Sequence, residues 1–227
     1  HQEYDYPPET ILSHSFFMRN PEEFYRFYKN KMLCLDAKPN MAHKKLAELE
    51  KAGKLKAVIT QNIDGLHQAA GSKEVLELHG SVHRNYCMKC GKSYDAEYML
   101  HAEGVPTCSC GGRIKPDVVL YEEGLDMTVM ARAIQAIQDA DMLIILTAVE
   151  KVAVNFGKEN EKWLDDLTVS QARKYIEEGQ FAAGSMLPKV QACVDFASSG
   201  TGRTAMITLL EKAKDGIMGK TGTQIHL

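Results

Sequence analysis

Apolar and polar positions divide most of the chain into segments of helical periodicity and short apolar runs. Apolar side chains recur at helical spacing over residues 21–31, 40–52, 126–138, 169–178, 190–197 and 211–218. Short, mostly apolar runs of the kind found in buried strands cover residues 57–60, 75–78, 117–121, 142–146, 152–156, 204–210 and 223–227. This alternation predicts an α/β fold with a Rossmann-like, mostly parallel sheet.

Some element ends carry signals of their own. Asn20 precedes Pro21 and is a candidate N-terminal cap, while Gly53 is placed to stop the second helix. The final run, 223–227, is expected to add a strand at the edge of the sheet. No long linker interrupts the alternation, so the pattern taken alone predicts one α/β unit.

Bulk properties exclude several classes of protein. The 227 residues carry a formal net charge of -3 and a sequence pI of about 6.3, so no broad basic surface is expected to hold nucleic acid. No apolar run approaches the ~20 residues of a membrane helix, and we expect a cytoplasmic protein without a membrane segment. Because the chain begins at His1 without an initiator methionine, we expect a fragment of a longer protein.

Four of the six cysteines form two close pairs, Cys87 with Cys90 and Cys108 with Cys110. Each pair can bring both sulfurs to one tetrahedral zinc ion, and the adjacent glycines suit a zinc-ribbon insert over residues 83–115. Four thiolates leave no open position for water or substrate, so the ion is expected to be structural. Disulfides or four unrelated buried cysteines are the alternatives.

Polar groups gather where the first two predicted strands end. The loop 60–67, with the sequence TQNIDGLH, follows the first strand, and His79 ends the second. Parallel neighbours would bring both ends into one cleft, where open α/β sheets bind ligands. The alternatives are a plain Asn-x-Asp-Gly turn and a histidine that makes only a structural hydrogen bond.

Several motifs occur in the order seen in sirtuins, which are NAD-dependent protein-lysine deacetylases. These are Lys38-Pro39-Asn40 with Ala42-His43, the loop 60–67, ELHG at 77–80, the four cysteines and PDVV at 116–119. The chain resembles sirtuins over about residues 4–146. The resemblance implies bound NAD, a structural zinc ion and acetylated lysine peptides or proteins as partners.

The resemblance also implies roles for individual residues. Asn62 and Asp64 would orient the nicotinamide, Gln61 would contact the ribose, and Ile63 would help to wall the acyl-lysine tunnel. His79 would be the general base that activates a ribose hydroxyl, which needs a neutral imidazole near physiological pH. His14, His67, His83 and His101 lack such support, and we expect them to be surface or structural residues.

A substrate peptide is expected to add as an extra strand along Val118, Val119, Leu120 and Tyr121. Sirtuins that prefer succinyl groups resemble one another in a Tyr-x-x-Arg pair, and the matching stretch, residues 28–31, is YKNK. Without the arginine, acetyl is the expected acyl group. Glu122 stands where sirtuins usually have glycine, so the sequence does not determine the backbone geometry of this peptide-binding segment, the peptide lip.

The resemblance to sirtuins breaks at both ends. The glycine-rich loop that cradles the pyrophosphate in sirtuins would precede His1. After about residue 140 the chain instead resembles the last third of carbamate kinases, for example over 146–158 and 182–189. By that resemblance Lys189, beside the start of a helix, would touch a transferred phosphoryl group, whereas a simple helix start is the alternative.

We therefore expect a chimeric sheet, with a sirtuin-like region at 1–146 and a carbamate-kinase-like segment at 147–227. The predicted function is that of an NAD-dependent protein-lysine deacetylase fragment, with activity impaired if NAD-binding segments are missing. The alternatives are an inactive zinc and peptide-binding module and a nucleotide-binding remnant of a carbamate kinase.

Overall fold

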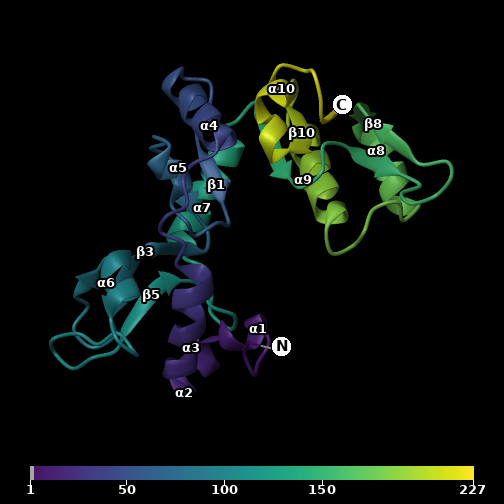
Figure 1. Cartoon of the computed structure of the whole chain (residues 1–227). Coiled ribbons are helices and arrows are strands. Elements are labelled where there is room, and N and C mark those ends of the chain that lie inside the picture. The colour runs from purple at the N-terminus through teal and green to yellow at the C-terminus, as the bar shows by residue number, and fades with distance from the viewer. Residues whose placement is uncertain (1–2) are drawn as a thin grey trace. The chain divides into compact units, whose positions relative to one another are not determined.

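The computed structural model describes residues 3–227, which form two compact units (Figure 1). The first contains the chain up to Pro39 together with Leu49–Ile134, and the second contains Asn40–Glu48 with Gln135–Leu227. The α/β class predicted from the sequence is confirmed. The expectation of one unit is wrong, because the strands divide among four separate sheets instead of joining one.

The first unit opens with short helices that are capped by side chains. Helices α1 (Pro8–Ile11), α2 (His14–Arg19) and α3 (Pro21–Phe27) follow one another closely. Asn20 accepts a hydrogen bond from the N–H of Glu23 at 3.4 Å, which confirms the predicted cap. The helix expected over 21–31 changes at residue 28 into a π-helix, Tyr28–Met32.

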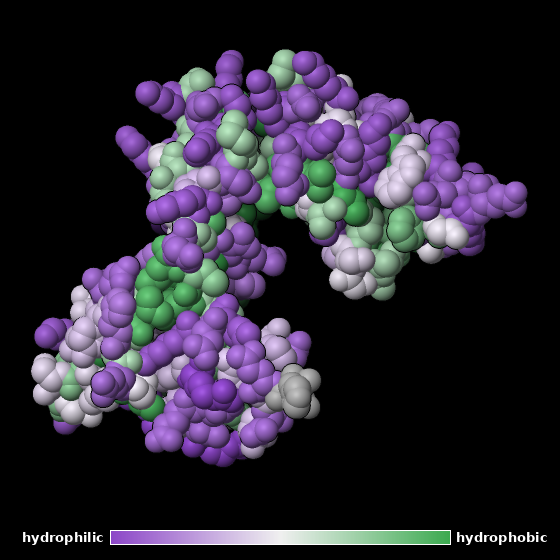
Figure 2. Space-filling model, viewed as in Figure 1, coloured by the Kyte–Doolittle hydropathy of each residue, from purple (hydrophilic) through white to green (hydrophobic). Residues whose placement is uncertain are grey.

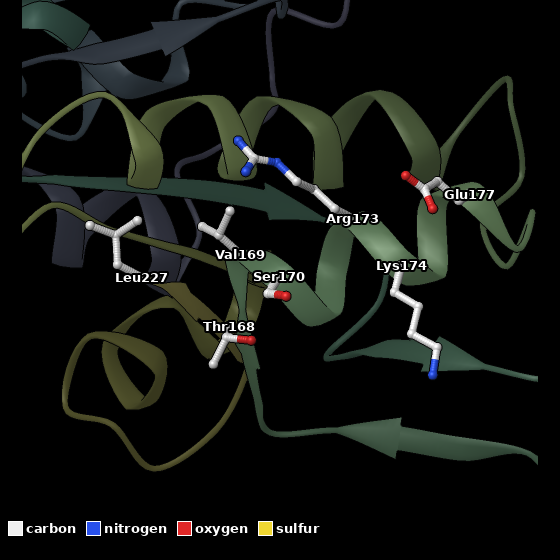
Figure 3. Close-up of a pocket in the computed structure, with 7 residues that line it drawn as sticks. All are labelled: Thr168, Val169, Ser170, Arg173, Lys174, Glu177 and Leu227. Atoms are coloured by element: carbon white, nitrogen blue, oxygen red, sulfur yellow. The ribbon is translucent and has the colours of Figure 1, made fainter.

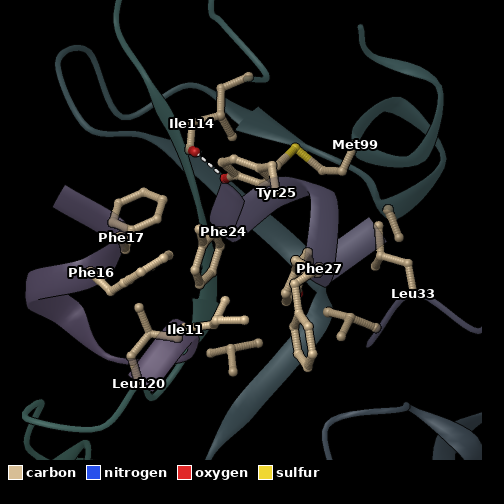
Figure 4. Packing of buried hydrophobic residues seen from close by; sticks show 14 of the residues in the cluster. Ile11, Phe16, Phe17, Phe24, Tyr25, Phe27, Leu33, Met99, Ile114 and Leu120 are labelled. Atoms are coloured by element: carbon tan, nitrogen blue, oxygen red, sulfur yellow. Dashed lines mark hydrogen bonds between the residues drawn. The ribbon is translucent and has the colours of Figure 1, made fainter. Parts of the chain in front are cut away.

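Aromatic side chains from these helices form the core of the first unit (Figure 4). Phe24 stacks on Tyr28 with ring centroids 5.5 Å apart, and Phe17 meets Phe24 edge-on at 4.8 Å. The buried Tyr25 hydroxyl donates to the carbonyl oxygen of Ile114, which ties the helical segment to the cysteine-bearing insert. Burial raises the pKa of Tyr25 far above its usual value, so this donor keeps its proton.

The cysteine-bearing insert is a small antiparallel sheet. Its strands are β3 (Gly80–Cys87), β4 (Ser93–Tyr94) and β5 (Ile114–Val118), in the order β4-β3-β5. Helix α6 (Ala96–His101) packs on β3. The strand predicted over 117–121 is therefore displaced, because pairing with β3 begins at Ile114 and the chain leaves the ladder after Val118.

A separate parallel pair carries the polar loop. Strands β1 (Val58–Thr60) and β2 (Val75–Glu77) pair with each other, and the short helix α5 (Leu66–Ala69) lies between them in sequence. Helix α4 (Met41–Lys51) precedes β1 and ends before Gly53, which has φ of +73° as a stop requires. Helix α7 (Met127–Gln138) leads into the second unit.

The second unit is built on one mixed sheet. Its strand order is β6-β10-β11-β9. Strand β6 (Met142–Thr147) runs parallel to β10 (Thr204–Leu209). Strand β11 (Thr223–His226) runs antiparallel to β10 and parallel to β9 (Asp166–Thr168). The last strand is thus internal, not at the edge as predicted. Strands β7 (Val152–Val154) and β8 (Lys162–Leu164) pair with each other in a separate two-stranded antiparallel sheet.

Helices complete the second unit. They are α8 (Val169–Glu177), α9 (Met186–Ser198), a 3₁₀ turn (Leu210–Lys212) and α10 (Ala213–Ile217). Buried side chains of α9 such as Val190 and Val194 pack with Ile207 and Ile225 of the sheet in a second core. Within residues 3–227, no helix is long and apolar enough to cross a membrane.

Candidate functional site

The ends of β1 and β2 lie side by side, as the sequence predicted. Thr60 pairs with Glu77, and the N–H of Leu78 donates to the carbonyl oxygen of Thr60 at 2.9 Å. Farther along, the N–H of Val82 donates to the carbonyl oxygen of Ile63 at 3.0 Å. The loop after β1 therefore runs alongside the segment that contains His79.

The loop is shaped by its own polar groups. The Asn62 N–H donates to the hydroxyl of Thr60, and the Leu66 N–H donates to the Asp64 carboxylate, each at 3.0 Å. Asp64 thereby makes the turn that opens α5, which is the structural alternative considered from the sequence. Gln61 and Asn62 are exposed, whereas Ile63 and Asp64 are half-buried, so the loop still presents an amide pair to solvent.

His83 supports the loop from β3. Its Nε2 lies 3.0 Å from the carbonyl oxygen of Asp64. A Cβ at Gly65, where φ is +70°, would stand 2.7 Å from the His83 ring, so this position needs glycine. His83 is therefore structural, as expected, and its contact with the Asp64 carbonyl oxygen holds the Asp64 turn against β3.

His79 is held through its main chain. Its carbonyl oxygen accepts the N–H of Val119 at 3.0 Å, and its side chain is half-buried. The next residue, Gly80, has φ of +79°, and a Cβ there would lie 1.9 Å from the carbonyl oxygen of Asp117. Only glycine permits this close approach of β3 and β5, which places His79 directly beside the residues expected to bind peptide.

Arg84 links the elements around His79 and was not singled out from the sequence. Its guanidinium donates to Glu77 at 2.8 Å and to Asp117 at 2.9 Å. These carboxylates belong to β2 and β5, on either side of the His79 segment. No pattern in the sequence indicates this bridge, because it depends on the antiparallel pairing of β3 with β5.

The expected peptide lip lies mostly beyond the end of β5. The N–H of Tyr121 donates to Leu12 at 3.0 Å, and the carbonyl oxygen of Tyr121 accepts from His14 at 2.9 Å. Val118 and Leu120 are buried, while Tyr121 is 58% exposed. Val119 is half-buried, so Val119 and Tyr121 are the residues through which this segment reaches the surface.

Glu122 shows why a glycine is usual at its position. Its φ of +76° lies in the left-handed region, which costs a residue with a side chain. Its carboxylate accepts from both the N–H and the hydroxyl of Ser15, at 2.8 and 2.9 Å. These two bonds offset the backbone strain and lower the pKa of Glu122, so the lip keeps its turn without glycine.

The four predicted metal ligands converge. The sulfurs of Cys87, Cys90, Cys108 and Cys110 all lie within 4.8 Å of one another. A tetrahedral zinc ion with Zn–S bonds of about 2.3 Å separates its sulfurs by about 3.8 Å, close to the 3.5 Å between Cys87 and Cys110 and the 3.6 Å between Cys90 and Cys108. The donor set fits a structural zinc ion, and all four coordination positions are taken by protein.

Hydrogen bonds prepare these sulfurs for metal. The N–H groups of Cys90 and Lys89 approach the sulfur of Cys87 at 3.5 and 3.3 Å and lower its pKa. The N–H of Cys110 and then the hydroxyl of Tyr94 lower the pKa of Cys108 to about 6. Metal binds thiolates and not thiols, so Cys87 and Cys108 favour the binding form. The pKa of Cys110 is instead raised to about 11, because the effect of the Gly112 N–H, which lowers it, is outweighed by the neighbouring cysteine sulfurs and by burial.

The other histidines expected to be surface or structural have such positions. His14 lies 3.6 Å from Glu123, His101 lies 3.2 Å from Glu97, and both are exposed. His67 is buried in α5.

Lys189 in the second unit has one clear partner. It belongs to the first turns of α9, and its ammonium group donates to the hydroxyl of Thr147, at the end of β6, at 2.6 Å. Ser185, at the N-terminal end of α9, makes no side-chain cap.

A shallow pocket of about 540 Å³ lies on the second unit and contains none of the predicted site residues (Figure 3). Its lining includes Thr168, Arg173, Lys174 and Glu177. In Figure 3 the side chains of Arg173 and Lys174 point away from each other, and Thr168 accepts the N–H of Gln171 as a helix cap. These groups do not converge on one ligand.

The surface is mainly hydrophilic on the face seen in Figure 2, with smaller apolar areas. Exposed apolar side chains include Met127 and Ile134 of α7, which are 74% and 50% exposed.

Comparison with known proteins gives a consistent family. Residues 2–154 match the model of the Sir2 family. The chain is 60% identical over 144 residues to an NAD-dependent protein deacetylase of Clostridium acetobutylicum, a match that covers 63% of this chain and 59% of that protein. It is also 55% identical over 122 residues to the carbamate kinase-like protein YqeA of Escherichia coli, covering 54% of this chain and 38% of YqeA.

Solved structures agree with the family match. A structure of Sir2 bound to an acetylated peptide is 42% identical and superposes with a TM-score of 0.57, covering 63% of this chain and 62% of the other. A structure of Sir2 with a p53 peptide and NAD+ is 43% identical, with a TM-score of 0.57 and coverage of 64% and 62%. The chain thus spans about three fifths of the length of the deacetylases it matches.

Proposed function

The chain belongs to the Sir2 family, and we propose that its residues 1–146 carry the acyl-lysine and nicotinamide part of an NAD-dependent protein-lysine deacetylase. The single observation that supports this most strongly is the shared end of β1 and β2, where the Leu78-to-Thr60 hydrogen bond joins the 60–67 loop to the His79 segment. Such strand ends are where open α/β sheets bind ligands.

In this proposal the loop residues divide the recognition of NAD. The exposed Gln61 contacts the ribose, while Asn62 and Asp64 orient the nicotinamide and Ile63 walls the acyl-lysine tunnel. When bound there, NAD would supply the ribose carbon at which the acetyl oxygen replaces nicotinamide. His79 takes the proton of a ribose hydroxyl, a role that a neutral imidazole performs near pH 7.

Peptide recognition is proposed for Val118, Val119, Leu120 and Tyr121. The exposure of Tyr121 and the partial exposure of Val119 support addition of an extended acetyl-lysine peptide along this segment. Tyr28 is buried in the π-helix and Lys31 pairs with Glu3 at 2.8 Å. Because no arginine stands at position 31, acetyl remains the proposed acyl group over an acidic one.

We also propose a domain boundary between residues 146 and 147. Residues 1–146 would be the sirtuin-like region, with its zinc-ribbon module at about 83–115, and 147–227 would derive from a carbamate kinase. The match to YqeA covers 122 residues, more than 147–227 contains, so it supports a carbamate-kinase-like C-terminal part and also extends before this boundary. Since β6 pairs with β10, the resulting sheet would combine strands from both origins. The thiolate cluster favours a reducing compartment such as the cytoplasm.

Nicotinamide release from NAD and an acetylated peptide tests the catalytic proposal. We expect His79→Ala to lower the rate by about 100-fold or more, since general-base catalysis contributes roughly 10²–10⁴-fold. His101→Ala is the matched control, because that imidazole lies on the zinc module and is exposed. Equal rates in wild type and His79→Ala would end the assignment of His79 as the base.

Peptide binding separates the deacetylase from the alternative of an inactive zinc and peptide-binding module. Anisotropy of a labelled peptide, acetylated or not, is measured with and without NAD. Binding of the acetylated peptide without any nicotinamide release would favour the inactive module. Absence of binding in both conditions would contradict peptide recognition altogether.

A nucleotide-binding remnant is the second candidate function, favoured by the Lys189 contact with Thr147 and by the YqeA match. A titration with ATP that saturates for wild type and is lost in Lys189→Ala would support it. Lys174→Ala, which removes an exposed lysine of α8, is the control. No saturable ATP binding by wild type would eliminate this candidate.

A further inference from the structure

The first cysteine of each metal-binding loop, Cys87 in loop 87–90 and Cys108 in loop 108–110, receives different hydrogen bonds at its sulfur. In the first loop the N–H groups of both Lys89 and Cys90 point at the sulfur of Cys87, at 3.3 and 3.5 Å. In the second loop the residue three places after Cys108 is Gly111, and its N–H donates at 2.8 Å to the Cys108 carbonyl oxygen instead. The shorter spacing therefore costs Cys108 one main-chain donor.

A side chain fills this gap. The hydroxyl of Tyr94 donates to the sulfur of Cys108 at 3.0 Å. Tyr94 comes from β4, outside both cysteine loops, and its main chain is fixed by pairing with Asn85, whose side-chain amide also donates to the Tyr94 carbonyl oxygen at 3.3 Å. The ring lies against Tyr98 with centroids 4.6 Å apart, so the hydroxyl is aimed by packing on two sides.

The charge of the cluster makes such a donor useful. Four thiolates around one divalent ion leave two negative charges, which second-layer donors stabilise. Lys92 lies over the Tyr94 ring at 5.4 Å, and Lys89 donates to the Cys110 carbonyl oxygen at 3.4 Å. Both ammonium groups therefore add positive charge beside the negatively charged cluster.

We propose that Tyr94 is a positioning residue of the metal centre, whose hydroxyl takes the place of the missing main-chain donor to Cys108. It holds the sulfur in its coordinating direction and draws electron density from it. The bound ion is thereby released more slowly, and Cys108 reacts less readily with electrophiles. This role concerns the zinc module alone and does not depend on deacetylation.

Zinc affinity of the full chain tests the proposal. Competition with the chromogenic chelator 4-(2-pyridylazo)resorcinol is followed for wild type, Tyr94→Phe and Tyr98→Phe. Loss of a second-layer partner typically costs about 10–100-fold in metal affinity, and we expect a loss of that size for Tyr94→Phe. Tyr98→Phe is the matched control, because its hydroxyl donates to the Thr107 carbonyl oxygen at 3.1 Å and not to sulfur. Equal affinities in all three proteins would overturn the proposal.

Cobalt substitution distinguishes a hydrogen bond to sulfur from a merely structural ring. In the Co²⁺-loaded chain, loss of the donor leaves the Cys108 thiolate richer in electrons, so its charge-transfer band moves to lower energy in Tyr94→Phe. Only metal-loaded, folded protein gives this band, so weaker folding of the apo variant does not obscure it. An unchanged band in Tyr94→Phe, or the same shift in Tyr98→Phe, would refute the role of the hydroxyl.

Discussion

The two units of this chain have hydrophobic cores that are built differently. The first unit gathers short helices and small sheets around stacked aromatic rings and a tetrathiolate site, with hydrogen bonds such as Tyr25 to Ile114 between distant segments. The second unit packs amphipathic helices on one four-stranded sheet, with aliphatic residues such as Val190 and Ile207 in its core. Irregular structure is thus concentrated where the chemistry is proposed.

This difference teaches where stability comes from. Short strands and single-turn helices bury little surface by themselves, so the first unit needs a metal ion and large aromatic side chains. Regular pairing over six residues of β6 and β10 makes the second unit less dependent on any single group. The two units should therefore respond differently to the same kind of perturbation.

Removal of zinc should have the largest effect, and only on the first unit. Structural zinc contributes on the order of 10 kcal/mol to the folding of zinc-finger peptides, and without it no ion joins the four sulfurs. We expect hydrogen exchange in peptides that cover residues 80–118 to rise by about 100-fold or more after chelation. Peptides that cover 186–226 serve as the internal control. An equal rise in exchange there would contradict the expectation that zinc stabilises only the first unit.

Core truncations should have the next largest effects. Phe24 and Ile207 are both fully buried. Phe24→Ala should lower the free energy of unfolding by about 3–5 kcal/mol and Ile207→Ala by about 2–5 kcal/mol, because each leaves a cavity. Measured by hydrogen exchange, each loss should appear in its own unit, whereas loss of protection in both units would show that they unfold together.

Helix caps should matter less and about equally in the two units. Asn20 caps α3, and Thr168 caps α8 in a reciprocal capping box with Gln171. Replacement of either by alanine should destabilise its own unit by about 1 kcal/mol, as measured by denaturant unfolding with exchange readout. A glycine at the same positions should cost only a few tenths of a kcal/mol. Alanine variants as stable as wild type would show that these caps do not contribute to stability.

The smallest effect is expected at His226, a half-buried residue of the second unit. The hydrogen bond to Asp166 raises the pKa of His226 above its usual value. The pair therefore stabilises the fold below the unfolded pKa of about 6.5 and loses this contribution as pH rises through the folded value. An NMR titration should show a raised pKa that returns toward normal in Asp166→Asn, and no change between the two proteins would contradict the pairing.

Several elements were predictable because their signals are local. Asn20, Gly53 and the apolar run of β6 lie where the sequence placed a cap, a stop and a strand. Strand β3 was missed because its register shifts between Ser81 and Asn85, which breaks the alternation that marks a strand. The short strands β8 and β9 were missed because three residues carry too little pattern.

The candidate site shows the same division. The four cysteines were found because their spacing alone fits one ion, and the loop 60–67 was found because it collects polar groups after an apolar strand. His83 and Arg84 were not recognised as supports of the site, since their partners come from three other segments. Asp64 follows β1, Glu77 ends β2 and Asp117 lies on β5, and only the fold brings them to β3.

The sequence by itself determined most helices and the longer apolar strands, the metal ligands and the order of the family motifs, because periodicity, ligand spacing and loop composition are properties of neighbouring residues. The tertiary structure alone decided that the chain forms two units, that β11 lies inside its sheet, and that Tyr94 reaches the sulfur of Cys108. These features depend on contacts between residues far apart in the chain, and their geometry is set by how strands pair and side chains pack.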